Sequence, residues 1–217
     1  MSAWMTARRS VASSAARRTV VEQGFSLVEF LVSSLIVLVM ATSVFGLLSH
    51  MQRAGSYQAE VQGVLENTRL AVETIERILE QAGNDPLGAG FPGIAITSAT
   101  QVRVRSDLTG SAGPGSPDKG DPDGDTDDAN EDVTIRFNAS ALSIELVPAG
   151  GTAQPVASNI SAFTMQYFGG DGVPAGTGND VRRIRFLLTG TSPLPDPQTR
   201  RIFSMQLCSD VQLIARR

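Results

Sequence analysis

The chain of 217 residues has a single cysteine and a single histidine, and both shortages exclude classes of function. One cysteine, Cys208, allows no disulfide within the chain, so a folded body depends on packing, partners or metal. The one histidine, His50, directly follows a long apolar run, so the body cannot contain a Ser-His-Asp or Cys-His arrangement. Phosphate-binding and dinucleotide-binding motifs and zinc clusters are also missing from the sequence. We therefore predict a protein that is not an enzyme, although the many acids leave a carboxylate pair for glycoside hydrolysis open.

Positive charge is scarce beyond the first 24 residues. That segment, a basic leader, holds four arginines and one acid, whereas the rest of the chain holds 14 basic and 21 acidic residues. Nucleic acids are bound by clustered lysine and arginine, so no nucleic acid partner is expected for the acidic body. The length allows one folded domain together with an anchor.

Residues 25–48 form an apolar run that contains no lysine, arginine or proline and only one charge, Glu29. A helix of about 24 residues spans roughly 36 Å, which is enough to cross a bilayer core. The run is too long for the apolar region of a cleaved secretory signal. Because the arginines precede the run, the positive-inside rule places the N-terminus in the cytoplasm and the body outside. A carboxylate within such a run raises the free energy of membrane insertion, so a function is expected for Glu29.

The segment Gly24-Phe25-Ser26-Leu27-Val28-Glu29 resembles the processing motif of type IV prepilins. This resemblance implies that a prepilin peptidase cuts between Gly24 and Phe25 and methylates the new amine of Phe25. It also implies that Glu29 pairs with the Phe25 amine of a neighbouring subunit, because buried charges are tolerated when they are paired. Major pilins usually have a helix-breaking proline where this chain has Gly46, which favours a minor subunit. The body resembles PilW-type minor pilins in its layout: the pattern from Arg69-Leu70-Ala71 to Gln81-Ala82-Gly83, an acidic segment, and the tail Ser209-Asp210-Val211.

The function implied by the resemblance is structural: a minor pilin that takes part in type IV pilus assembly or initiation at the inner membrane. The implied partners are other pilin or minor pilin subunits, the prepilin peptidase and the inner membrane, with a pilus or pseudopilus as the assembled location. A J-type minor pseudopilin of type II secretion is the related alternative. A membrane-tethered module that binds calcium or another ligand, and an ordinary signal-anchored protein, are alternatives of other classes.

Residues 49–84 are predicted to continue the helix as an amphipathic segment, which ends at Gly83-Asn84-Asp85-Pro86. The residues of its predicted buried face, which fall at helical spacing, are Val61, Val64, Leu65, Thr68, Val72, Ile75, Leu79 and Ala82. From residue 85 to residue 217 the apolar period changes from helical spacing to two, which indicates strands. The predicted strands lie around residues 94–96, 102–104, 133–137, 142–146, 163–167, 184–188 and 203–213. The expected fold is therefore α+β and pilin-like, with a long N-terminal helix packed on one antiparallel sheet.

An acidic loop at residues 107–132 is rich in Gly, Pro, Ser and Asp. Part of it has the spacing of an EF-hand loop, but Thr126 replaces the turn glycine, aspartate replaces the last glutamate, and a strand follows directly. A looser Ca²⁺ site remains one interpretation, and a disordered acidic loop or a partner-facing patch is the other. The candidate metal ligands are Asp121, Asp123, Asp125, Asp127 and Asp132.

Overall fold

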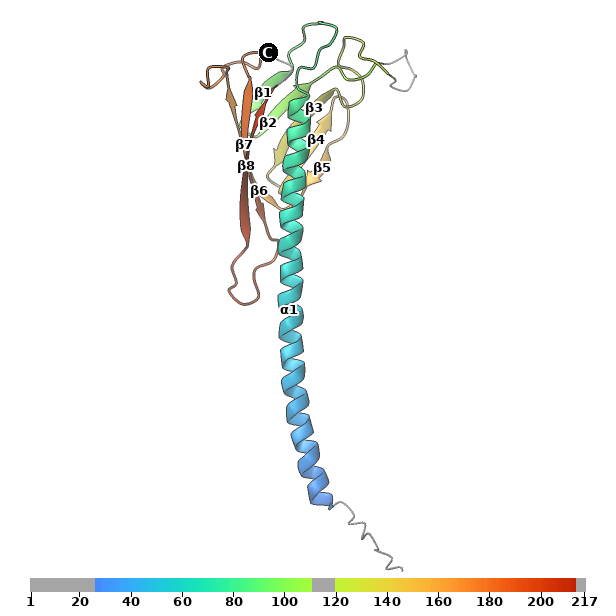
Figure 1. Cartoon of the computed structure of the whole chain (residues 1–217), viewed down its shortest axis with the longest axis vertical. Helices are drawn as coiled ribbons and strands as arrows, with labels where there is room; N and C mark the ends of the chain where they lie inside the picture. The colour runs from blue at the N-terminus through green and yellow to red at the C-terminus, as the bar shows by residue number, and fades with distance from the viewer. Residues whose placement is uncertain (1–25, 111–119, 214–217) are drawn as a thin grey trace, which may run out of the picture. The chain divides into compact units, whose positions relative to one another are not determined.

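The computed structural model describes residues 26–110 and 120–213, and these ranges contain one helix and eight strands (Figure 1). The elements are α1 (Leu27–Glu80), β1 (Ile94–Ser98), β2 (Gln101–Arg105), β3 (Asp132–Asn138), β4 (Ser143–Pro148), β5 (Gln154–Ala157), β6 (Ile160–Phe168), β7 (Arg183–Thr191) and β8 (Ser204–Gln212). The predicted α+β class is confirmed. The chain divides into two units, Met1–Ser49 and His50–Arg217, and the boundary falls within α1.

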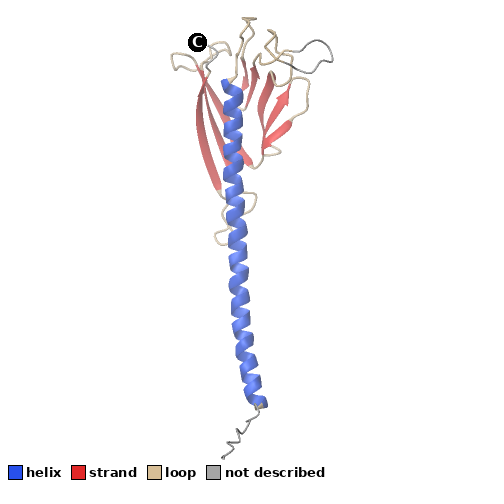
Figure 2. Cartoon of the chain, turned by 45° about the vertical axis from the view of Figure 1, so that its right-hand side comes forward, coloured by secondary structure: helices blue, strands red, loops and turns tan. Residues whose placement is uncertain are grey.

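The strands form two antiparallel sheets. Five strands pair in the order β1-β2-β3-β4-β5, and three pair in the order β6-β7-β8. Figure 2 shows both sheets beside the C-terminal part of α1, which belongs to the same unit. Backbone bonds tie the sheets together, because the Met165 N–H of β6 donates to the Ala99 carbonyl, which lies between β1 and β2, at 2.6 Å.

The core of the second unit lies between α1 and the inner faces of the sheets. The helix contributes residues that recur every three or four positions, as an amphipathic helix requires. They are Val64, Thr68, Ala71, Ile75 and Leu79. Alternate residues of β2 and β3 meet this stripe from one sheet, and alternate residues of β6 and β7 meet it from the other. The rings of Phe163 and Phe186, on neighbouring strands, lie with centroids 6.1 Å apart.

The end of α1 follows the predicted chemistry. The helix ends at Glu80, and Gly83 adopts a left-handed φ of 76°, which a glycine accommodates without the strain of a side chain. The Gly83 N–H donates to the Arg105 carbonyl at the end of β2 at 2.7 Å. The glycine therefore both stops the helix and joins it to the first sheet.

The prediction of a single sheet was wrong, because period-two alternation fixes which face of a strand is buried but not which strands pair. The short strand β5 was not predicted; it is a four-residue edge strand that contains Pro155, which an edge position tolerates. Leu142 was placed on a strand, but it is exposed with a left-handed φ of 49° in the turn before β4. Cys208 lies on the exposed face of β8.

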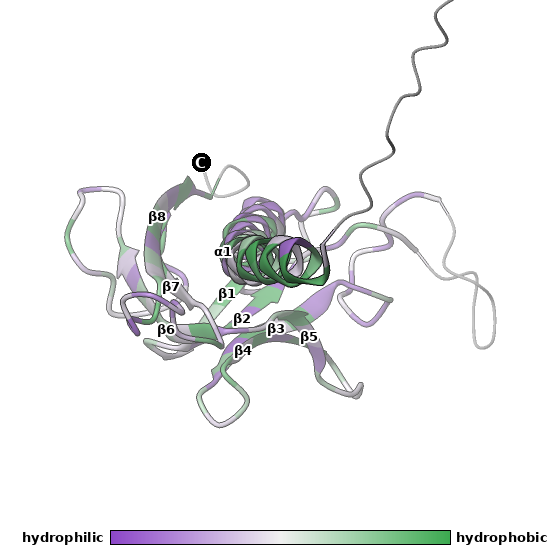
Figure 3. Cartoon of the chain, turned by 90° about the horizontal axis from the view of Figure 1, so that it is seen from below, coloured by the Kyte–Doolittle hydropathy of each residue, from purple (hydrophilic) through white to green (hydrophobic). Residues whose placement is uncertain are grey.

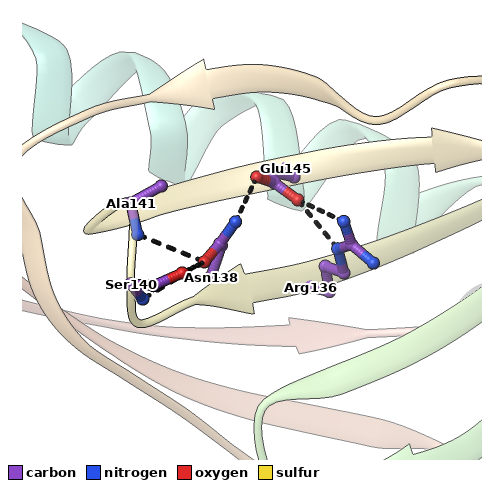
Figure 4. Close-up of polar contacts among 5 residues, drawn as sticks. All are labelled: Arg136, Asn138, Ser140, Ala141 and Glu145. Atoms are coloured by element: carbon purple, nitrogen blue, oxygen red, sulfur yellow. Dashed lines mark hydrogen bonds and ion pairs between the residues drawn. The ribbon is translucent and has the colours of Figure 1, made fainter.

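A polar network holds the β3–β4 hairpin (Figure 4). Arg136 and Glu145 are cross-strand partners, and Arg136 Nε donates to Glu145 Oε2 at 2.8 Å. The Asn138 amide donates to Glu145 Oε1 at 2.8 Å, while its carbonyl oxygen accepts bonds from Ser140 and Ala141 in the turn. The bond from Asn138, followed by that from Arg136, lowers the pKa of Glu145 below its ordinary value of 4.5.

We predict that Gly190→Ala destabilises the body. A Cβ at this buried position of β7 would overlap the Thr68 hydroxyl and lie 3.2 Å from Val64 Cγ1 of the helix stripe. Overpacking of this kind costs about 1–3 kcal/mol, so the midpoint of thermal unfolding, followed by circular dichroism, falls. The matched control is Gly63→Ala on α1, where a Cβ meets nothing within 4 Å and helix propensity improves by up to ~1 kcal/mol. Equal unfolding midpoints for the two variants would show that α1 is not closely packed against β7 at Gly190.

We also predict that the contribution of Glu145 depends on pH. Because its folded pKa is lowered, its stabilisation is complete above about pH 4.5 and is lost as the pH falls through the folded value. Glu145→Gln should therefore lower the melting temperature clearly at about pH 7 and much less at about pH 3. The control is Glu66→Gln on the exposed face of α1. A Glu145→Gln effect of the same size at both pH values contradicts this account.

Candidate functional site in the apolar helix and the acidic loop

The first half of α1 is apolar on all sides. From residue 26 to residue 49 every side chain except Ala41 is exposed in the chain, including Leu27 at 75% and Phe30 at 67%. In Figure 3 the turns of α1 nearest the viewer are mostly coloured as hydrophobic. The helix is long and apolar enough to cross a membrane by length and composition. A surface of this kind is suited to lipid or to other apolar helices rather than to water.

Four hydroxyl groups in this segment are bonded within the helix. Ser34 donates to the Leu31 carbonyl at 2.9 Å, and Thr42 donates to the Val39 carbonyl at 2.8 Å. Ser43 and Ser49 make the equivalent bonds to carbonyls four residues earlier. Polar groups that are satisfied inside the helix can enter hydrocarbon without a partner, so these residues do not oppose insertion.

Glu29 is the only charged residue in this segment. It lies in the first turn of α1 and its side chain is exposed. The positive end of the helix dipole favours an acid at this position. Among the residues that the structure describes, no hydrogen bond or ion pair is recorded for its carboxylate. The predicted processing residues Gly24 and Phe25 lie outside the described residues.

The structure brings some of the predicted metal ligands together. Asp121, Asp123, Asp125 and Asp127 are all exposed in one loop. The Asp125 and Asp127 amides each donate to the aspartate two residues earlier, at 3.3 Å and 3.0 Å. A hydrogen bond to the Asp125 carboxyl and the negative charges of Asp125, Asp123 and Glu131 raise the pKa of Asp127. These side chains therefore share one region of negative potential.

Asp132, the fifth predicted ligand, has a different environment. It opens β3, is buried, and its carboxylate accepts a bond from Arg103 Nε at 2.6 Å. Arg105 Nε lies 3.5 Å from the same carboxylate. In ranges 26–110 and 120–213, no three His, Cys, Asp or Glu side chains are placed to hold a metal ion. The calcium site built from these five aspartates stays a prediction.

Two acids that the sequence did not distinguish from the rest of the loop are buried at its base. Glu131 and Asp107 are 0% exposed, although both belong to a segment whose composition predicts solvated carboxylates. Glu131 Oε1 accepts bonds from the Leu108 and Thr109 amides at 2.7 Å and 2.8 Å. Asp107 Oδ2 accepts a bond from the Gly124 amide at 2.9 Å. Their sequence neighbours carry no signal of burial, because the backbone donors they meet are not visible in residue types.

A surface pocket of about 410 Å³ lies beside the start of the second unit. The described residues that line it are His50, Arg53, Ala54, Tyr57, Gln58, Asp196, Pro197 and Gln198. They include no serine or cysteine nucleophile. Hydrogen bonds from the Gln198 amide and then from the Thr199 hydroxyl hold the pKa of Asp196 below its ordinary value. The Asp196 carboxylate therefore stabilises the turn at residues 196–199.

In comparisons with known proteins, no family model and no curated protein matches this chain. What the chain does must therefore be inferred from the helix and the loop themselves.

Proposed function

We propose that this chain is a minor pilin-type subunit, which is anchored in the inner membrane by residues 25–48 and assembles laterally with related subunits. The observation that carries the proposal is α1, whose first half exposes apolar side chains on all sides and has its only charge, Glu29, in the first turn. An anchor that only held a body to the membrane would need no acid there. A helix that packs with others can use the acid as a specific contact.

The proposed mechanism is assembly. A prepilin peptidase cuts after Gly24, on the cytoplasmic side of the apolar run, so the anchor remains in the mature chain. The new amine of Phe25 is a cation at the membrane face, and Glu29 of a neighbouring subunit pairs with it as the helices pack. The pair neutralises both charges within a bundle of apolar helices. The body, with its two sheets, is then presented outside the membrane.

The same mechanism serves a type IV pilus or the pseudopilus of a type II secretion system. Both need a subunit with this type of anchor, and the PilW-like layout of the sequence favours the pilus. Deletion of the gene in its native host, followed by assays of pilus display and of protein secretion, separates the two systems.

The first prediction of this proposal concerns processing. The mature chain isolated from membranes should begin with a methylated Phe25, as determined by N-terminal sequencing and mass spectrometry. Gly24→Val places a branched side chain at the junction and should leave the leader attached. Gly46→Val, the same change inside the helix, should leave processing intact. A mature chain that begins at any other residue contradicts the prepilin interpretation.

The second prediction concerns Glu29. Glu29→Ala should remain in the membrane, because the run becomes more apolar. Its association with partner subunits, measured by cross-linking and co-purification, should fall about 100-fold or more, since removal of one member of a buried ion pair costs about 3–5 kcal/mol. Glu29→Asp should restore part of the association, and Ser33→Ala on the same helix should leave it unchanged. Normal assembly of Glu29→Ala would rule out this mechanism.

A further inference from the structure

The base of the acidic loop contains two buried carboxylates with incomplete bonding. Asp107 follows β2 and Glu131 precedes β3, and both residues are 0% exposed. Each carboxylate uses one oxygen to accept backbone N–H groups of the loop. Among residues 26–110 and 120–213, the second oxygens, Asp107 Oδ1 and Glu131 Oε2, are buried and have no hydrogen-bond partner. The Thr109 hydroxyl oxygen is also buried without a partner in this part of the chain. Three buried oxygen atoms at the base of the loop are thus unpartnered among the described residues.

These three residues are held close together by the backbone. The Ser106 amide donates to the Glu131 carbonyl at 2.9 Å, which places the strand end before Asp107 beside Glu131. The amide of Thr109 itself binds the Glu131 carboxylate at 2.8 Å. The Asp107 backbone is fixed on its other side, because its carbonyl accepts a bond from the Asn84 side chain at 2.7 Å. The three residues that carry the unpartnered oxygens are therefore fixed by hydrogen bonds at the base of the loop.

The exposed part of the loop folds over this arrangement. The Gly124 amide binds the Asp107 carboxylate, so the exposed aspartates are attached directly to the buried pair. A Cβ at the buried Gly110 would lie 2.6 Å from the Asp121 carbonyl oxygen and 3.1 Å from Asp123 Cβ. The segment from Asp121 to Gly124 therefore lies against Asp107 and Gly110.

The neighbouring residue, Asp132, is a buried acid whose charge is compensated by arginines. Asp132 is adjacent to Glu131 in the sequence, and its carboxylate is paired with Arg103 and Arg105. For Asp107 and Glu131, no ion pair with a cationic side chain is recorded among the described residues. A buried carboxylate without a compensating charge is strongly unfavourable. A bound cation would supply the positive charge that these two carboxylates lack.

We propose that Asp107 and Glu131, together with the Thr109 hydroxyl, form the base of a binding site for a hard divalent cation. The ligands are all oxygen, which selects Ca²⁺ or Mg²⁺ and disfavours zinc. Water and the oxygens of the covering loop complete the coordination, since two carboxylates alone do not fill it. The site is different from the EF-hand-like arrangement that the spacing of the exposed aspartates predicts. It does not depend on the proposed assembly function, so each can fail without the other.

The test uses the full chain in detergent after removal of metals with a chelator. Ca²⁺ and, separately, Mg²⁺ are titrated while binding heat and thermal unfolding are measured. The expected result is saturable binding and a melting temperature that rises by roughly 5–10 °C when the cation exceeds its Kd about 100-fold. Sodium chloride at matched ionic strength should give no such rise. Absence of both heat and shift at millimolar Ca²⁺ and Mg²⁺ overturns the proposal, as does an equal shift with sodium chloride.

Two variants locate the site. Glu131→Gln and Asp107→Asn keep a side-chain oxygen that can accept hydrogen bonds from the loop amides, but they remove the negative charge. Each variant should therefore weaken cation binding at least tenfold. Without cation, each should melt at or above the temperature of the unmodified chain, because a buried charge has been removed. Glu66→Gln, which neutralises an exposed acid on α1, should keep the full response. Cation binding that is unchanged in both loop variants overturns the assignment. If a variant does not fold, the titration of the unmodified chain still decides.

Discussion

The folded body depends on one stripe of α1 that lies against two sheets at once. Apolar side chains of both sheets belong to one core with the same helix residues, which exclude water from both inner faces. Thr68 and Val64 approach β7 at Gly190, where the missing side chain lets the helix come close. Contacts at the other end of the stripe, between Gly83 and Arg105, tie the helix to the first sheet. The two sheets are therefore stabilised as one unit.

Most elements of the fold could be predicted from local patterns, because helical and alternating periods report directly which side chains are buried. The stripe of α1, with Ile75 and Leu79 at its centre, and seven of the eight strands follow from such patterns. The grouping into two sheets could not be predicted, because it depends on strand partners far apart in the sequence. The strand that was missed, β5, is short, lies at an edge and contains Pro155, so it has no alternation to detect.

The candidate functional residues, too, could be predicted only where a local sequence pattern marks them. Glu29 could be identified because a single charge in an apolar run is conspicuous, and the structure places it in the first turn of the helix. The acidic loop was conspicuous as well, but its composition could not show which carboxylates are buried. Asp132 is held by Arg103, which lies 29 residues away, and Glu131 is held by amides of Leu108 and Thr109. Such contacts arise only when β2 and β3 pair, and the pairing is a property of the fold.

The distribution of burial along α1 has a consequence for its local stability. Between residue 50 and residue 63 no helix residue is fully buried, whereas the stripe from Val64 to Leu79 packs into the core. Glu60 makes one isolated contact in this stretch, accepting the Leu194 amide at 3.1 Å. Backbone amides of the stretch can therefore exchange their hydrogens with solvent by local opening of a turn. Amides of the stripe can exchange only when the core itself opens, so a single continuous helix has two levels of protection.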